Sequence, residues 1–216
     1  MVTVIGITGG IGAGKSSASA ILGELGAEVI DADKAAHQVY LPDTPAWREI
    51  VAAFGDEVLA ADRTIDRRKL GPRVFADPAA LQTLNGILHG KIFAYIQGQI
   101  AYIRQKQAAR PRQASASVDN EPARAQRVVV VEAAVLLEAG WQALVDQLWV
   151  VVAPVEVAIA RLRDAKGMPE DQARARIAAQ MSNDERIAHA DTVIHNAADL
   201  DALRDAITAA WQRGGF

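Results

Sequence analysis

Short apolar runs alternate along the chain with longer stretches in which apolar residues recur at helical spacing. The runs occupy residues 2–7, 28–30, 127–131, 148–153 and, more weakly, 192–194. Runs of this length without polar alternation are typical of strands that are buried on both faces. Strands that alternate with helices favour a parallel sheet, because each helix returns the chain to the same edge. We therefore expect an α/β fold with a five-stranded parallel sheet covered by helices on both sides.

A long helical stretch, residues 34–107, separates the second apolar run from the third. It is too long for one crossover helix, so we expect a helical region that covers an acceptor substrate. Within it, Asp77 and Pro78 are typical of a helix start, with the aspartate as N-cap and the proline in the first turn. The core of this single domain would then comprise about residues 1–33 and 127–216.

Residues 108–126 contain almost no large apolar side chain. A segment of this composition cannot bury enough apolar surface to offset the entropy lost on ordering it. We therefore expect a flexible surface loop. A partner or modification site around Ser115 and Ser117 is the alternative interpretation.

The first apolar run leads directly into Gly9-x-x-x-x-Gly14-Lys15-Ser16, and helical spacing follows over residues 17–25. This is the pattern of a phosphate-binding loop, so the fold is expected to be of the P-loop NTPase type. The glycines let backbone N–H groups turn toward a phosphate, Lys15 adds a positive charge, and Ser16 is placed to hold a magnesium ion. The residues expected to bind the nucleotide are Gly9, Gly10, Ile11, Gly12, Ala13, Gly14, Lys15, Ser16 and Ser17.

The composition limits the kind of substrate. The chain has 216 residues, half of them hydrophobic, which suffices for a full core, and no cysteine, which excludes disulfides, thiolate metal sites and a cysteine nucleophile. A net charge of -3 and a pI of about 5.8 give no global attraction for nucleic acid or anionic membranes, so we expect a small-molecule substrate. The first strand begins at Val2 and no apolar run approaches the about 20 residues that span a bilayer, so we expect a cytoplasmic location.

Two acids, Asp31 and Asp33, end the second strand at the edge of the sheet where the phosphate-binding loop also lies. An acceptor hydroxyl needs an acid that orients it and takes its proton, and magnesium needs oxygen ligands. Either acid could do either job. Each could instead cap the helix expected from Lys34.

An acid also ends the third strand. Glu132 follows an apolar strand. In P-loop enzymes an acid in this position reaches magnesium directly or through water, so Glu132 is a candidate magnesium residue. A carboxylate that simply faces solvent is the alternative. Glu138 is a weaker candidate, because it could only start the next helix.

Cationic residues gather after the fourth strand. Arg161 and Arg163 lie on the helix that follows it, and a second helix is expected from Pro169. A hinged helical pair that carries cations suits a lid, over about residues 161–180, that closes over transferring phosphates and neutralises their charge.

The four histidines show no spacing typical of metal ligands. Each is therefore expected to be structural, with one exception. His89 lies near Asn85 in the region expected to cover the substrate, so it could contact the acceptor.

Together these motifs resemble those of the dephospho-CoA kinases along nearly the whole chain. Many P-loop proteins share the first motif, but very few share the set. The residues that carry the resemblance are Thr8-Gly9-Gly10-Ile11-Gly12-x-Gly14-Lys15-Ser16, Val29-Ile30-Asp31-Ala32-Asp33, Arg67-Arg68-x-Leu70 with Val74-Phe75, Leu84-Asn85 with Leu88-His89, Leu136-x-Glu138, Gln180, Arg186 and Ala190-Asp191-x-Val193-Ile194-x-Asn196. Residues 133–141 also resemble the kinase half of the eukaryotic bifunctional coenzyme A synthase.

The resemblance implies transfer of the γ-phosphoryl group of ATP to the ribose 3′-hydroxyl of 3′-dephospho-CoA, with Mg²⁺ as cofactor and Asp33 as general base. It implies that Lys15 and the loop amides hold the β- and γ-phosphates, that Arg161 and its lid neighbours close over them, and that Asn196 lies near the adenine. The acceptor-binding residues that it implies are Asp33, Arg67, Asn85, His89 and Glu138. We expect a monomer or a small homo-oligomer.

The chain departs from the family pattern in its lid. The family usually has a second arginine followed by aspartate where this chain has Ala165 and Lys166. Arg163 or Lys166 could take the place of that arginine. Two further differences, Gly90 and Ala134 in place of prolines, concern local shape more than chemistry.

Three other functions are alternatives to this one. The nearest is a kinase of the same fold with another acceptor, such as a nucleoside monophosphate. Ala165 motivates a second alternative, a nucleotide-binding regulatory protein with weakened transfer. A GTP-driven switch is disfavoured, because the sequence has no Asn-Lys-x-Asp motif to read guanine.

Overall fold

The computed structural model describes residues 2–109 and 127–216 of the chain. These residues form two compact units, which we call the sheet unit, up to Ile30 and from Ile103 onward, and the helical unit, Asp31–Tyr102. The predicted surface loop at residues 108–126 lies outside the described residues apart from its first two positions, so it stays a prediction.

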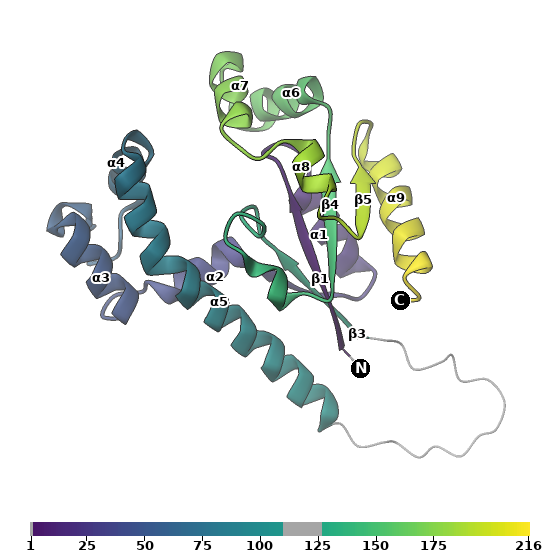
Figure 1. Ribbon diagram of the computed structural model, residues 1–216, viewed down its shortest axis with the longest axis horizontal. Coiled ribbons are helices and arrows are strands. Elements are labelled where there is room, and N and C mark those ends of the chain that lie inside the picture. Colours follow the sequence, from purple (N-terminus) through teal and green to yellow (C-terminus); the bar gives the residue numbers. More distant parts are fainter. Residues whose placement is uncertain (1, 110–126) are drawn as a thin grey trace. The chain divides into compact units, whose positions relative to one another are not determined.

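A single five-stranded sheet, in the order β2-β3-β1-β4-β5, forms the centre of the sheet unit (Figure 1). The pairs β1–β3, β1–β4 and β4–β5 are parallel. The strands are β1 Val2–Gly9, β2 Glu28–Asp31, β3 Arg127–Glu132, β4 Gln147–Val152 and β5 Thr192–His195. The sheet predicted from the apolar runs is therefore confirmed, with strand ends that differ by one or two residues.

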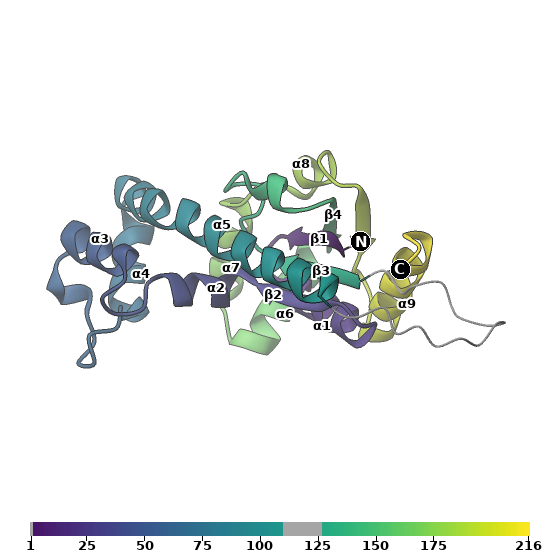
Figure 2. The same ribbon diagram turned by 90° about the horizontal axis from the view of Figure 1, so that it is seen from below.

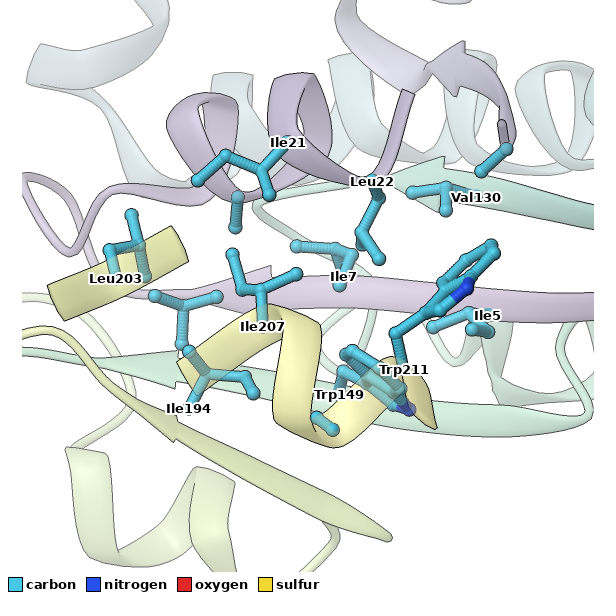
Figure 3. Close-up of a cluster of buried hydrophobic side chains, with 14 of the residues drawn as sticks. Ile5, Ile7, Ile21, Leu22, Val130, Trp149, Ile194, Leu203, Ile207 and Trp211 are labelled. Atoms are coloured by element: carbon cyan, nitrogen blue, oxygen red, sulfur yellow. The ribbon is translucent and has the colours of Figure 1, made fainter. Parts of the chain in front are cut away.

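Both faces of the sheet are covered, as continuous apolar strands require. Ile5 and Ile7 on β1 pack with side chains of α1 (Lys15–Glu24) and α9 (Leu200–Arg213) in one buried cluster (Figure 3). Gly6 between them faces the other side, where an added Cβ would lie 2.8 Å from the side chain of Leu136. Helix α8 (Asn183–Ile187) lies on that second side, opposite α1 and α9 (Figure 2).

The remaining helices of the sheet unit follow the order predicted from the sequence. They are the 3-10 helix η2 Trp141–Leu144, α6 Val155–Lys166 and α7 Glu170–Ala178. Helix α1 begins at Lys15 rather than at the predicted residue 17, because the loop passes into the helix at Gly14. Within the described part of the chain, no helix is both long and apolar enough to cross a membrane.

The helical unit has its own core, built around Trp47, Ile50 and Phe54. Its elements are α2 Ala32–Val39, α3 Pro45–Phe54, the 3-10 helix η1 Asp56–Val58, α4 Arg67–Ala76 and most of α5 Pro78–Ala108. The predicted start of α5 is confirmed, because the N–H of Ala79 donates to Oδ1 of Asp77 at 2.9 Å.

Candidate active site

The phosphate-binding loop connects β1 to α1, and its neighbours leave no room for a side chain at Gly9 or at Gly14. A Cβ on Gly9 would lie 2.3 Å from the carbonyl oxygen of Val151 on the neighbouring strand β4. Gly14 has φ of 98°, and a Cβ there would lie 2.1 Å from Nδ2 of Asn196. Since real Cβ atoms do not approach other atoms so closely, the spacing of these glycines follows from the packing around the loop.

Two hydrogen-bond donors of the loop that could bind a phosphate donate to acceptors within the protein. Nζ of Lys15 donates to the carbonyl oxygens of Gly9 at 2.9 Å and of Gly10 at 3.0 Å. The N–H of Ile11 donates to Oε1 of Gln180 at 2.9 Å. Sequence reasoning missed the contact of Gln180, whose only signal was its place in the family pattern. A bound phosphate oxygen would be an alternative acceptor for both donors.

Asn196 and Arg161 lie beside the part of the loop formed by Ala13 and Gly14. Asn196 follows β5 and is only 4% exposed, and its Nδ2 donates to the carbonyl oxygen of Ala13 at 2.8 Å. Arg161 on α6 donates to Oδ1 and to the main-chain oxygen of Asn196, each at 3.0 Å, and to the carbonyl oxygen of Ala198 at 2.8 Å. The structure thus brings both predicted residues to the loop, and it joins them to each other.

Ser16 and Glu132 meet at the carboxyl end of the sheet. Oγ of Ser16, in the first turn of α1, donates to Oε1 of Glu132 at the end of β3, at 2.8 Å. Ser17, the other predicted serine, follows on α1 and is exposed. The described residues contain no group of three or more acidic or histidine side chains that could hold a metal by themselves. A hydroxyl and a carboxylate are nevertheless oxygen ligands of the kind that magnesium takes together with water and phosphate.

Asp31 and Asp33 lie in different local environments. Oδ1 of Asp31 accepts hydrogen bonds from the N–H groups of Asp33 at 2.9 Å and of Lys34 at 3.1 Å, so Asp31 is the N-cap of α2. Asp33 is exposed in the first turn of that helix. The prediction that both acids lie at the end of the strand is wrong for Asp33. Asp31 caps α2, so the helix begins at Ala32 and Asp33 lies within it.

His37 lies one turn after Asp33 on α2 and hydrogen-bonds to Arg67 at the start of α4. Burial, followed by the positive charge of Arg67, lowers the pKa of His37 below its usual 6.5, against a smaller opposing effect of Asp33 and Asp31. Burial raises the pKa of Tyr40, whose ring packs against His37. This corner of the helical unit therefore combines an exposed carboxylate with a guanidinium and an uncharged imidazole at neutral pH.

Asn85 and His89 lie one turn apart on α5 and are both half-buried. Burial lowers the pKa of His89 below 6.5, which keeps this imidazole uncharged at neutral pH as well. An uncharged imidazole can both donate and accept a hydrogen bond. The pair is thus suited to polar recognition, as the sequence predicted for an acceptor site.

Comparison with known proteins identifies the family. Residues 3–110 and 113–202 match the family model for dephospho-CoA kinase. The chain belongs to the dephospho-CoA kinase family. It is 41% identical to the dephospho-CoA kinase of Symbiobacterium thermophilum, over 97% of this chain and 80% of that protein, and 41% identical to that of Geobacter metallireducens, over 97% and 95%.

Solved structures support the same fold. The chain aligns with a crystal structure from Thermus thermophilus at a TM-score of 0.71 and 27% identity, over 98% of this chain and 97% of that one. It aligns with the dephospho-CoA kinase from Campylobacter jejuni at a TM-score of 0.69 and 24% identity, over the full length of both chains. The predicted family and the predicted P-loop fold are both confirmed.

Glu138, a further residue of the dephospho-CoA kinase pattern, is engaged in an ion pair. It lies in the turns between β3 and η2 and accepts a hydrogen bond from Nη2 of Arg186 on α8 at 2.7 Å. Arg186 is only 1% exposed, so Glu138 compensates a buried charge. A contact of Glu138 with the acceptor stays a prediction.

The positions at which the chain departs from the dephospho-CoA kinase pattern are exposed or half-exposed. Ala165 and Lys166 end α6 and are exposed, and Arg163 on the same helix donates to its neighbour Asp164 at 2.9 Å. Gly90 on α5 has open space around its Cβ position, so the missing proline leaves no packing defect. The structure gives neither Arg163 nor Lys166 a partner on the phosphate-binding loop within the described residues, and the replacement of the lid arginine stays a prediction.

Proposed function

We propose that this protein transfers the γ-phosphoryl group of ATP to the ribose 3′-hydroxyl of 3′-dephospho-CoA and releases coenzyme A and ADP. One observation supports this above all others: a complete phosphate-binding loop, shaped by Gly9 and Gly14, in a chain that matches the dephospho-CoA kinase family over nearly its whole length. Kinases of this fold act largely by positioning and charge neutralisation, which the loop and its neighbouring cations supply.

The ATP site is built on the loop in this proposal. Its N–H groups and Lys15 bind the β- and γ-phosphates, and the internal bonds of Lys15 and Ile11 exchange for bonds to phosphate oxygens. Arg161 and Asn196 complete the site at the start of the lid and near the adenine. The proposed nucleotide-binding residues are Gly9, Gly10, Ile11, Gly12, Ala13, Gly14, Lys15, Ser16, Ser17, Arg161 and Asn196.

Ser16 and Glu132 would hold magnesium, Glu132 directly or through water. Oγ of Ser16 and Oε1 of Glu132 lie 2.8 Å apart, which supports an ion site that both oxygens share. Magnesium usually takes only one or two protein ligands and fills its other positions with water and phosphate, so this donor set fits the ion. When bound, the ion would neutralise charge on the transferring phosphates.

The acceptor site lies in the helical unit in this proposal. The carboxylate of Asp33 takes the proton of the 3′-hydroxyl while that oxygen bonds to the γ-phosphorus and the bond from phosphorus to the β–γ bridging oxygen breaks. Asp33 suits this role because Asp31, not Asp33, caps α2. Arg67, Asn85 and His89 would bind polar groups of the acceptor. Residues 34–107 then cover the acceptor, and residues 161–180 form the lid.

A coupled ADP-release assay with dephospho-CoA and with nucleoside monophosphates as acceptors tests the proposal. We expect ADP release that depends on dephospho-CoA and exceeds the rate with any nucleotide. Turnover with a nucleoside monophosphate but not with dephospho-CoA would show that the acceptor is a nucleotide. ATP binding without turnover would favour the regulatory function that Ala165 motivates. A cytoplasmic location and a monomeric or small homo-oligomeric state remain predictions from the sequence.

A further inference from the structure

The orientation of the Asn196 amide is fixed by its partners. The guanidinium of Arg161 has only donors, so it must face Oδ1, and the carbonyl of Ala13 has only acceptors, so it must face Nδ2. Arg161 also binds the main-chain oxygen of Asn196, and the N–H of Asn196 donates to the carbonyl oxygen of Val152 on β4 at 2.8 Å. Both the main chain and the side chain of Asn196 are therefore held from several directions.

The bond from Asn196 to Ala13 determines where the next amide points. The peptide between Ala13 and Gly14 is planar and trans, so the carbonyl of Ala13 and the N–H of Gly14 point in opposite directions. With the carbonyl turned toward Asn196, the N–H of Gly14 turns away from it. Among the residues that the structure describes, this N–H has no acceptor, so it is available to a ligand of the loop.

Glycine makes this peptide easy to turn over. Gly14 has no Cβ, so it has access to positive and negative φ at similar cost, and the peptide before it has no strong preference of its own. The observed φ of 98° is one of these alternatives. An external contact is needed to select it, and the amide of Asn196, packed against Gly14, is the contact that the structure provides.

We infer that Asn196 is a positioning residue, which holds the peptide between Ala13 and Gly14 so that the N–H of Gly14 faces the phosphates. Arg161 acts through Asn196, because its bond to Oδ1 holds the amide that contacts the loop, and its bond to the main-chain oxygen holds the backbone of the same residue. This inference rests on the proposed ATP site, but it assigns both residues to the shape of the loop rather than to a direct contact with adenine or with the transferring phosphate.

Inorganic tripolyphosphate separates these two roles, since it offers the loop its phosphates without any adenine. The test is the affinity of the Asn196→Ala variant for ATP and for tripolyphosphate, measured by calorimetry at fixed magnesium concentration. We expect both affinities to fall in parallel by about tenfold, the value of one buried hydrogen bond. Asn183→Ala is the matched control, because Nδ2 of Asn183 also donates to a main-chain oxygen, that of Ala153 at 3.0 Å, but not to the loop.

The outcomes are distinct. Unchanged binding of tripolyphosphate by Asn196→Ala, or a loss confined to ATP, would overturn the inference in favour of an adenine contact. An equal loss in Asn183→Ala would show that the effect is general and would overturn it too. If the unaltered protein bound neither ligand, the proposed function itself would fail.

The role of Arg161 is tested by a double-mutant cycle with Arg161→Lys, which keeps the positive charge and removes the forked geometry. We expect Arg161→Lys to weaken tripolyphosphate binding in the unaltered background and to have no further effect in Asn196→Ala. Additive losses would show that Arg161 acts independently of Asn196. Should Asn196→Ala fail to fold, Arg161→Lys alone remains decisive, since tripolyphosphate binding equal to that of the unaltered protein would contradict the inference.

Discussion

Asp31 and Asp33 are close in sequence but have different roles. Asp31 caps α2, and Asp33 is the proposed general base. Oδ1 of Asp31 accepts hydrogen bonds from the N–H groups of Asp33 and Lys34, and this cap starts α2. Asp33 is left with an exposed carboxylate one turn before His37. The sequence could not separate the two acids, because the choice depends on where the helix begins, and a cap can stand at either position.

Asp33→Asn should reduce turnover by at least about 100-fold, because the amide cannot take the proton of the acceptor hydroxyl. Affinity for ATP should stay unchanged, since Asp33 is not part of the phosphate-binding loop. Turnover is measured by ADP release and affinity by calorimetry. Asp31→Asn is the control, because asparagine caps a helix about as well as aspartate does; an undiminished rate in Asp33→Asn would remove Asp33 from the role of base.

At the scale of elements, the strands were predictable because each is a buried apolar run. The run at residues 127–131, for example, became β3 Arg127–Glu132. Within the stretch 34–107 the sequence predicts only one helix boundary, the start at Asp77 and Pro78, which is the start of α5. The other boundaries are not predicted. The break between α3 and α4 depends on η1 and on a single bridge between Leu59 and Ile65, which leave no periodic signal in the sequence.

Gly14→Ala should reduce affinity for ATP by about tenfold or more, because the added Cβ would lie 2.1 Å from Nδ2 of Asn196 and displace the loop. Gly26→Ala is the control, because it introduces backbone strain without a clash. Gly26 has φ of 103° but nothing within 4 Å of its Cβ position. Its variant should lose about 1–2 kcal/mol of unfolding free energy and keep its ATP affinity. Equal ATP affinities in the two variants would contradict the explanation; calorimetry and urea unfolding measure the two quantities.

The histidines of α2 and α5 should make folding stability depend on pH. Burial lowers the pKa of both His37 and His89 below 6.5 in the folded protein, while the unfolded chain keeps the ordinary pKa. As the pH falls through about 6.5, the unfolded state takes up protons that the folded state does not, so the free energy of unfolding falls. Urea midpoints between pH 8 and pH 5.5 measure this effect. The variant with both histidines changed to glutamine should show a flatter profile, and an unchanged slope would contradict this origin.

At the scale of the whole molecule, the family and the fold could be predicted because their motifs are local in sequence. The contacts that shape the loop are not local. Asn196 lies 183 residues from Ala13, and Gln180 lies 169 residues from Ile11. Only the packing of β5 and of the segment after α7 against the loop brings these pairs together, so sequence reasoning named Asn196 for another reason and gave Gln180 no role.

The chemical identity of the product tests the proposed reaction most directly. The protein is incubated with ATP, magnesium and dephospho-CoA, and the products are examined by phosphorus NMR and mass spectrometry. We predict one coenzyme A for each ADP, with a new phosphomonoester on the ribose 3′-oxygen. ATP that is bound but leaves dephospho-CoA unchanged, or a phosphate found at any other position, would contradict the proposed function.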